Sequence, residues 1–128
     1  MKRVKKTPPI RKPSAQYRAL RRYRKRYERF TARLRDLGYI CRGSITRQWL
    51  TCGKPSCVCH RDPAQRHGPY YYWTRKVEGR TQSRLLDASL ARLYGQGIRN
   101  HRKLDALIER MRDLSLFAFQ AAKMASNR

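Results

Sequence analysis

Apolar residues recur every three or four positions near the start of the chain, which is the period of an amphipathic helix. The apolar stripe consists of Leu20, Tyr23, Tyr27, Phe30, Leu34 and Leu37. Ser14 precedes this stripe, and its hydroxyl can cap a helix by accepting a hydrogen bond from a free backbone N–H. We therefore predict a helix over residues 14–37, ended by Gly38.

Alternating polarity, with β-branched and aromatic residues, replaces the helical period in the middle of the chain. This pattern predicts strands over residues 44–51, 69–76 and 81–86. Glu78-Gly79 suits a tight turn between the last two strands, which would then form a hairpin. We expect a small three-stranded antiparallel sheet.

The middle strand of this sheet carries two rows of side chains on opposite faces. The rows are Tyr70, Tyr72 and Thr74 on one face, and Tyr71, Trp73 and Arg75 on the other. One aromatic row can cover the core. The other row, with Arg47, Arg80 and Arg84 near it, can form a basic aromatic surface for a nucleic-acid groove or strand. The alternative is that all the aromatic side chains pack on the helices and the cysteine cluster.

Helical periodicity returns after Asp87, which can cap a second long helix over residues 87–126. Its apolar stripe consists of Leu90, Leu93, Tyr94, Ile98, Leu104, Leu107, Ile108, Met111 and Leu114. Gly95 and Gly97 interrupt the stripe. Because a glycine costs a helix interior about 1 kcal/mol relative to alanine, we expect a kink or a close helix crossing there.

Residues 114–122, called here the apolar tip, are apolar around most of the second helix. We expect this tip to pack on the first helix or on a second subunit or protein partner. The two apolar stripes can pair within one chain or across a homodimer, in the manner of a coiled coil.

These elements together predict an α+β protein, with a long basic amino-terminal helix, a three-stranded antiparallel sheet and a long carboxy-terminal helix. Residues 1–13 combine Lys and Arg with prolines and are expected to be a flexible basic arm. We expect residues 14–128 to form a single domain, in which residues 44–86 are the sheet module. A chain of 128 residues with 40% hydrophobic content supports a modest core, which a bound metal would help to stabilise.

Basic residues dominate the charge of the chain. Its 32 Lys and Arg against 8 Asp and Glu give a formal net charge of +24, which repels itself unless a polyanion neutralises it. Nucleic acid is the leading partner, with double-stranded DNA first and RNA second. An acidic membrane surface would also attract this charge, and ribosomal proteins show that a basic balance alone does not distinguish regulation from structural packing.

The helix over residues 14–37 has few acidic residues, Glu28 and Asp36, so like charges repel at most i,i+4 spacings. Such a face favours an anionic surface, although a solubilising face is the plain alternative. We assign phosphate contact to Lys2, Arg3, Lys5, Lys6, Arg11, Lys12, Arg18, Arg21, Arg22, Arg24, Lys25, Arg26, Arg29 and Arg33, and add Arg47, Arg75, Arg80 and Arg84 of the sheet.

Cysteines and histidines cluster with the spacing Cys52-x4-Cys57-x-Cys59-x7-His67. Thiolates and imidazole are the ligands that Zn²⁺ prefers, and four protein ligands leave no open position for a catalytic water. We predict a structural zinc site with these four ligands. Cys41 and His60 are alternatives for the fourth position.

A family resemblance rests on five segments of the chain. They are Gly43-Ser44-Ile45, Cys52-Gly53-Lys54, Cys57-x-Cys59, His67-Gly68-Pro69-Tyr70-Tyr71-Tyr72-Trp73 and Gly79-Arg80-Thr81, and they resemble an uncharacterised family of small bacterial proteins. The resemblance covers roughly the middle third of the chain and the helix after it, and it leaves the basic first helix outside. It implies that Cys52, Cys57, Cys59 and His67 are the shared cluster, without Cys41 or His60, and it implies no activity.

The acidic residues are scattered, so no Mg²⁺ site of the nuclease or transposase type is evident. Glu109 and Asp113 are expected to balance Arg102, Arg110 and Arg112 on the last helix. Gly95-Gln96-Gly97 lacks the flanking pattern of a phosphate loop, and the chain is too short for a full tyrosine-recombinase fold. We therefore predict that the protein is not an enzyme and has no small-molecule substrate.

Residues 1–6 resemble the start of a signal peptide, but no apolar segment follows them. No other run approaches the length of a membrane span, so we predict a cytoplasmic protein that lies on the nucleoid or in a nucleoprotein complex. In that reducing compartment, clustered cysteines favour a metal over a disulfide. The main alternative function is a structural or assembly subunit of a nucleoprotein complex.

Overall fold

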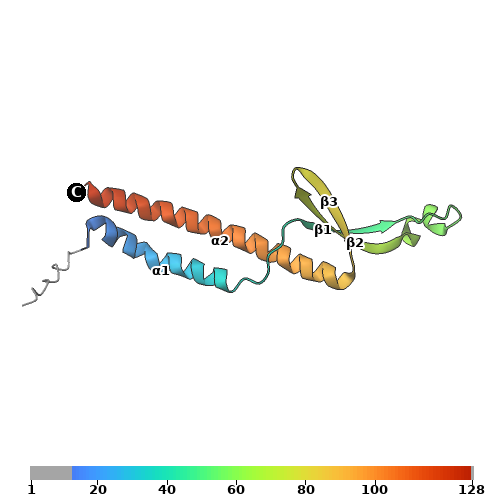
Figure 1. The fold of residues 1–128 in the computed structure, drawn as a ribbon, viewed down its shortest axis with the longest axis horizontal. Coiled ribbons are helices and arrows are strands. Elements are labelled where there is room, and N and C mark those ends of the chain that lie inside the picture. The colour runs from blue at the N-terminus through green and yellow to red at the C-terminus, as the bar shows by residue number, and fades with distance from the viewer. Residues whose placement is uncertain (1–12, 128) are drawn as a thin grey trace, which may run out of the picture. The chain divides into compact units, whose positions relative to one another are not determined.

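The structure is a computed structural model that describes residues 13–127 (Figure 1). Its helices are α1 (Ala15–Arg35) and α2 (Ala88–Ser126), and its strands are β1 (Ser44–Leu50), β2 (His67–Val77) and β3 (Arg80–Leu86). Two short 3-10 helices, η1 (Val58–His60) and η2 (Pro63–Gln65), lie between β1 and β2. The predicted α+β fold is confirmed. The basic arm lies outside the described residues, apart from Pro13.

Both long helices begin with the caps that the sequence predicts. The Tyr17 backbone N–H donates to the Ser14 hydroxyl at 3.1 Å, and the Leu90 N–H donates to Asp87 Oδ1 at 2.8 Å. These side chains satisfy backbone donors that lack partners in the first helical turn. At its other end α1 stops at Arg35, before the predicted Leu37, and the Leu37 N–H closes a tighter turn onto the Leu34 carbonyl at 3.3 Å.

The sheet has the order β1-β2-β3, and both strand pairs are antiparallel. β2 begins at His67, earlier than predicted, because His67 already pairs with Leu50 of β1. The β1 pairing ends at Ser44 opposite Thr74, whereas β3 continues to pair with β2 as far as Val77. Glu78 (φ 52°) and Gly79 (φ 78°) close the hairpin with two positive φ angles, as a type I′ turn requires.

The chain divides into two compact units, and α2 contributes to both. The helix-pair unit contains the described residues up to Arg33 and those from Leu107 onward, and the sheet unit contains Leu34–Ala106. That residues 14–128 form a single domain stays a prediction. Across the described residues, none of the helices is long and apolar enough to cross a bilayer.

In the helix-pair unit, α1 and the second half of α2 run antiparallel. Tyr17 and Phe119 line one hollow between them, while Phe30 and Arg110 line another. The buried residues are small or branched: Ala19 in α1, and Leu107, Leu114 and Ala118 in α2. The predicted stripe of α1 is less buried than expected, with Leu20 at 37% and Tyr27 at 38% exposure, since one partner helix covers a narrow strip.

The core of the sheet unit consists of Trp73, Leu86, Ala91 and Ile98, and Cys41, Ile45, Tyr71 and Tyr94 pack against it. The rings of Trp73 and Tyr94 lie 5.0 Å apart, so the first part of α2 packs on the Trp73 face of the sheet, around Trp73 itself. Trp73 Nε1 donates to the Arg42 carbonyl at 2.7 Å, which satisfies the polar atom of this buried ring.

The predicted basic aromatic row is wrong in its composition. The core-facing row is Tyr71 and Trp73, and the strand register places Arg47 opposite Tyr71, Arg84 opposite Trp73 and Arg80 opposite Val77. Alternation along the strands therefore puts these arginines on the Trp73 face. The remaining row, which contains Tyr70, Tyr72 and Thr74, shares its face with Thr46, Gln48 and Ser83.

The predicted close helix crossing at Gly95 and Gly97 is wrong, because the segment that approaches Gly97 is the extended chain at Tyr39 and Cys41 and not a helix. The alternative, a kink in α2, stays a prediction. The Cys41 N–H donates to the Gly97 carbonyl at 3.0 Å, and Asn100 Nδ2 donates to the Tyr39 carbonyl at 3.0 Å. A Cβ atom on Gly97 would lie 2.9 Å from Cys41 Cβ. Gly97 therefore lets the connection between α1 and β1 lie directly on α2.

Candidate metal centre

The four residues of the predicted cluster lie along the connection from β1 to β2 and at the first residue of β2. Cys52 follows the end of β1, Cys57 precedes η1, Cys59 lies within η1, and His67 is the first residue of β2. The pairing of Leu50 with His67 brings the two ends of this connection together. Asp62 caps η2 by accepting from the Ala64 N–H at 3.0 Å, which shapes the return toward His67.

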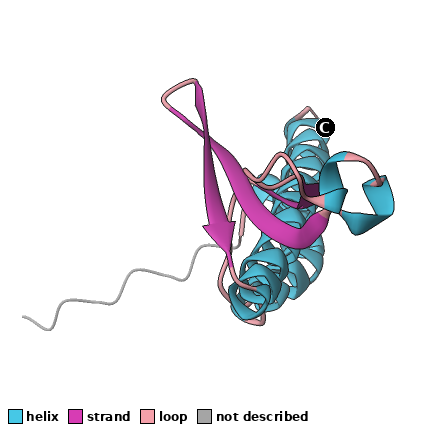
Figure 2. Cartoon of the chain, turned by 90° about the vertical axis from the view of Figure 1, so that its right-hand side faces the viewer, coloured by secondary structure: helices cyan, strands magenta, loops and turns pink. Residues whose placement is uncertain are grey.

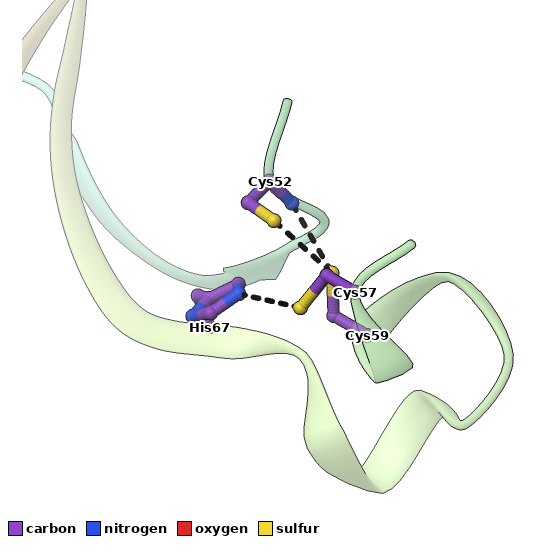
Figure 3. A group of neighbouring side chains, drawn as sticks. All are labelled: Cys52, Cys57, Cys59 and His67. Atoms are coloured by element: carbon purple, nitrogen blue, oxygen red, sulfur yellow. Dashed lines mark hydrogen bonds between the residues drawn. The ribbon is translucent and has the colours of Figure 1, made fainter. Parts of the chain in front are cut away.

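The three sulfur atoms and one His67 ring nitrogen all lie within 4.8 Å of one another. The Cys59 and Cys52 sulfurs are 3.6 Å apart, and the Cys57 sulfur lies 3.6 Å from His67 Nε2 (Figure 3). Cys59 is buried, Cys52 and Cys57 are half-buried, and His67 is exposed. This Cys3His cluster, called here the metal centre, could hold a metal ion.

The local hydrogen bonds favour thiolate at one position of the metal centre. The backbone N–H of Cys59 and the His67 imidazole lower the pKa of the Cys57 thiol to about 6. At Cys59, the backbone N–H of Cys52 lowers the pKa, but burial and the neighbouring thiols of Cys57 and Cys52 outweigh it, so that the pKa is raised. The thiolate is the form that binds metals. The lowered pKa therefore favours the metal-binding form of Cys57 near neutral pH.

The metal centre includes His67 and does not include the two alternative ligands. Cys41 packs against the core of the sheet unit, and its thiol donates to the Arg42 carbonyl at 3.3 Å. His60 ends η1 and is exposed. His67 is therefore the fourth member of the cluster in this structure.

The predicted phosphate-contacting residues fall into three groups. Lys2, Arg3, Lys5, Lys6, Arg11 and Lys12 lie outside the described residues, so their prediction stays untested. Those of α1 are all exposed: Arg18, Arg21, Arg22, Arg24, Lys25, Arg26, Arg29 and Arg33. Arg47, Arg75, Arg80 and Arg84 are exposed on the Trp73 face of the sheet.

Several carboxylates act as caps or in ion pairs. Arg24 pairs with Glu28 at 2.9 Å, and Arg112 pairs with Glu109 at 3.3 Å, as expected for the last helix. His101 lies 3.8 Å from Asp105. The absence of enzymatic activity stays a prediction.

One side chain that the sequence interpretation missed lies among the arginines of the sheet. Gln82 pairs with Arg75 across the hairpin, and it lines a shallow hollow of about 290 Å³ with Arg84, Trp73 and Ser83. The Glu78-Gly79 turn was the available signal, because a two-residue turn fixes which residues of the two strands face each other.

Fold and metal centre define a small α+β protein with a Cys3His cluster that could hold a metal ion. The chain belongs to the family of the domain of unknown function DUF6788, whose family model matches residues 15–95. Membership of an uncharacterised family is confirmed. The match includes α1, so the expectation that the basic first helix lies outside the family pattern is wrong. No curated protein and no solved structure matches the chain.

Proposed function

We propose that this protein binds nucleic acid, with double-stranded DNA as its first partner, mainly through contacts between α1 and phosphates. The observation that carries the proposal is the unbalanced charge of α1. Every Lys and Arg side chain of α1 is exposed, and Arg24–Glu28 is its single ion pair among the described residues. A polyanion would neutralise this surface.

The spacing of the basic residues supports the proposal, because like charges four apart on a helix repel each other. Arg18 and Arg22, Arg22 and Arg26, and Lys25 and Arg29 are such pairs. Each repulsion costs the isolated helix a few tenths of a kcal/mol, which phosphate contact would relieve. A helix that needed only solubility would gain from acidic residues at these spacings.

Zinc is the ion that we propose for the metal centre. For tetrahedral zinc with Zn–S bonds of about 2.3 Å, neighbouring sulfurs lie about 3.7 Å apart. The distance of 3.6 Å between the Cys52 and Cys59 sulfurs supports this fit. Four protein ligands fill the coordination sphere, so the ion would hold the end of β1 against the start of β2 in a structural role.

This assignment implies a cytoplasmic protein associated with the nucleoid or a nucleoprotein complex, without a catalytic role. The affinity for a duplex of random sequence, measured over a range of salt concentrations, tests the assignment. A protein that contacts six phosphates shows a slope of log K against log salt of about −5. We expect the metal-loaded chain to reach at least this slope, and a near-flat dependence would overturn the proposal.

A structural or assembly subunit is the second candidate. The exposed apolar tip favours it, since Leu116, Phe117 and Phe119 are about 60% exposed (60%, 60% and 62%) on α2. This candidate predicts a stable dimer or a protein partner in sedimentation at low micromolar concentration. RNA stays the alternative ligand, and a structured RNA of equal length belongs in the same salt titration.

A further inference from the structure

We propose that the end of the β2–β3 hairpin enters the major groove of double-stranded DNA and reads base edges with Arg75, Gln82 and Arg84. The inference rests on the proposed function and deepens it, because α1 would supply affinity and the hairpin would supply sequence preference. Residues 75–82 are called here the ribbon, and Arg84 lies at its base, opposite Trp73.

The ribbon has the dimensions of a groove-reading element. β1 does not pair with β2 beyond Thr74. Only β2 and β3 therefore continue from there to the Glu78-Gly79 turn. Figure 2 shows this hairpin extending past the rest of the sheet. The major groove of B-form DNA is about 12 Å wide and admits a two-stranded β-ribbon, whereas the deep, narrow major groove of duplex RNA does not.

The two faces of the hairpin differ in charge. Arg75, Arg80 and Arg84 share the Trp73 face with Gln82, and the opposite face carries Lys76 with Thr74, Thr81 and Ser83. On that opposite face the Thr74 and Ser83 hydroxyls bond to each other at 3.1 Å. The hairpin's acidic side chain, Glu78, lies in the turn. None of the ion pairs among the described residues involves these arginines.

One donor of the Trp73 face, Arg75, is held by stacking. The Arg75 guanidinium lies over the Trp73 ring, 4.5 Å from the ring centroid, and the buried ring is anchored by its bond to Arg42. Stacking on an anchored ring restricts the guanidinium, and Arg75 as a whole is exposed. Arg75, Gln82 and Arg84 line one hollow of about 290 Å³.

These side chains have the chemistry of base recognition. Arginine donates two hydrogen bonds to guanine, and glutamine both donates to and accepts from adenine. Removing such a contact weakens the preferred site by roughly 5- to 150-fold relative to other sequences. A surface that merely neutralised phosphates would not need a glutamine opposite Arg75 and next to Arg84 on the same face.

The experiment selects preferred duplexes from a random-sequence 20-base-pair DNA pool with the full, metal-loaded chain. Two double variants remove the reading side chains: Arg75→Ala with Gln82→Ala, and Gln82→Ala with Arg84→Ala. The second double variant keeps Arg75 and its stacking on Trp73. It therefore still tests base reading if the first double variant fails to fold. The matched control is Lys76→Ala with Thr81→Ala, a cross-strand pair on the opposite face.

We expect the parent chain and the control to bind the selected duplex at least tenfold more tightly than a shuffled duplex. The reading variants should lose this preference while keeping most of the salt dependence, and duplex RNA of the selected sequence should show no preference. The ribbon proposal is overturned if the parent binds every duplex equally with a steep salt dependence, or if the control loses preference as the reading variants do. An absence of salt-dependent DNA binding would instead remove the proposed function itself.

Discussion

The metal centre and the helix pair are stabilised in contrasting ways. In the metal centre, four side chains from one connection converge within 4.8 Å, and Cys59 is buried. In the helix-pair unit, a narrow strip of Ala19, Leu107, Leu114 and Ala118 is buried, and the basic side chains around it stay exposed. The first region therefore has a cluster that could hold an ion, whereas the second region leaves charged and apolar side chains at the surface.

The largest expected effect comes from removing a ligand of the metal centre. Cys57→Ser should release the metal and disorder residues 52–67, because metal affinity at such a site is also folding free energy. Trypsin should then cleave rapidly after Arg61 and Arg66, which lie in this connection. Metal analysis and timed proteolysis with mass spectrometry measure both effects, and a chelator should reproduce them in the parent chain.

Cys41→Ser is the matched control for this prediction, since Cys41 lies in the sheet unit outside the metal centre. It should keep its metal and the proteolysis pattern of the parent. The claim that a metal orders residues 52–67 is contradicted if the parent carries no metal and Cys57→Ser is as resistant to trypsin as the parent.

A smaller effect is expected at the glycines of α2. Gly97→Ala should destabilise the protein by about 1 kcal/mol or more, because its Cβ would lie 2.9 Å from Cys41 Cβ and the overlap outweighs the gain in helix propensity. Gly95→Ala should stabilise by about 0.5–1 kcal/mol, since its Cβ would be 3.6 Å from the end of the Arg99 side chain.

Urea denaturation, followed by circular dichroism on the metal-loaded chain, measures both free energies of unfolding. Opposite signs for these two alanine substitutions would confirm that the connection at Cys41 rests on α2. Equal stabilisation by both would show that this close contact is absent in solution.

Local patterns predicted the elements and the metal centre well. Ser14 and Asp87 cap helices as expected, and the Cys52-to-His67 spacing identifies residues that converge. Both features are formed by residues that are near one another in the sequence, so a local pattern can predict them. The failures arise from tertiary contacts. Which aromatic row faces the core depends on where α2 packs, and the partner of Gly97 is a segment far away in the sequence. Neither can be derived from periodicity.

The most direct test of phosphate binding by α1 is a charge-matched comparison of salt dependence. One variant removes three charges from α1 (Arg22→Gln, Lys25→Gln, Arg29→Gln), and the other removes three from the exposed surface of α2 in the sheet unit (Arg99→Gln, Arg102→Gln, Lys103→Gln). With about 0.9 of slope for each phosphate contact, the α1 variant should lower the slope of log K against log salt by roughly 3, and the α2 variant by less than about 1. Equal losses in the two variants would contradict the account, because net charge alone would then explain the binding.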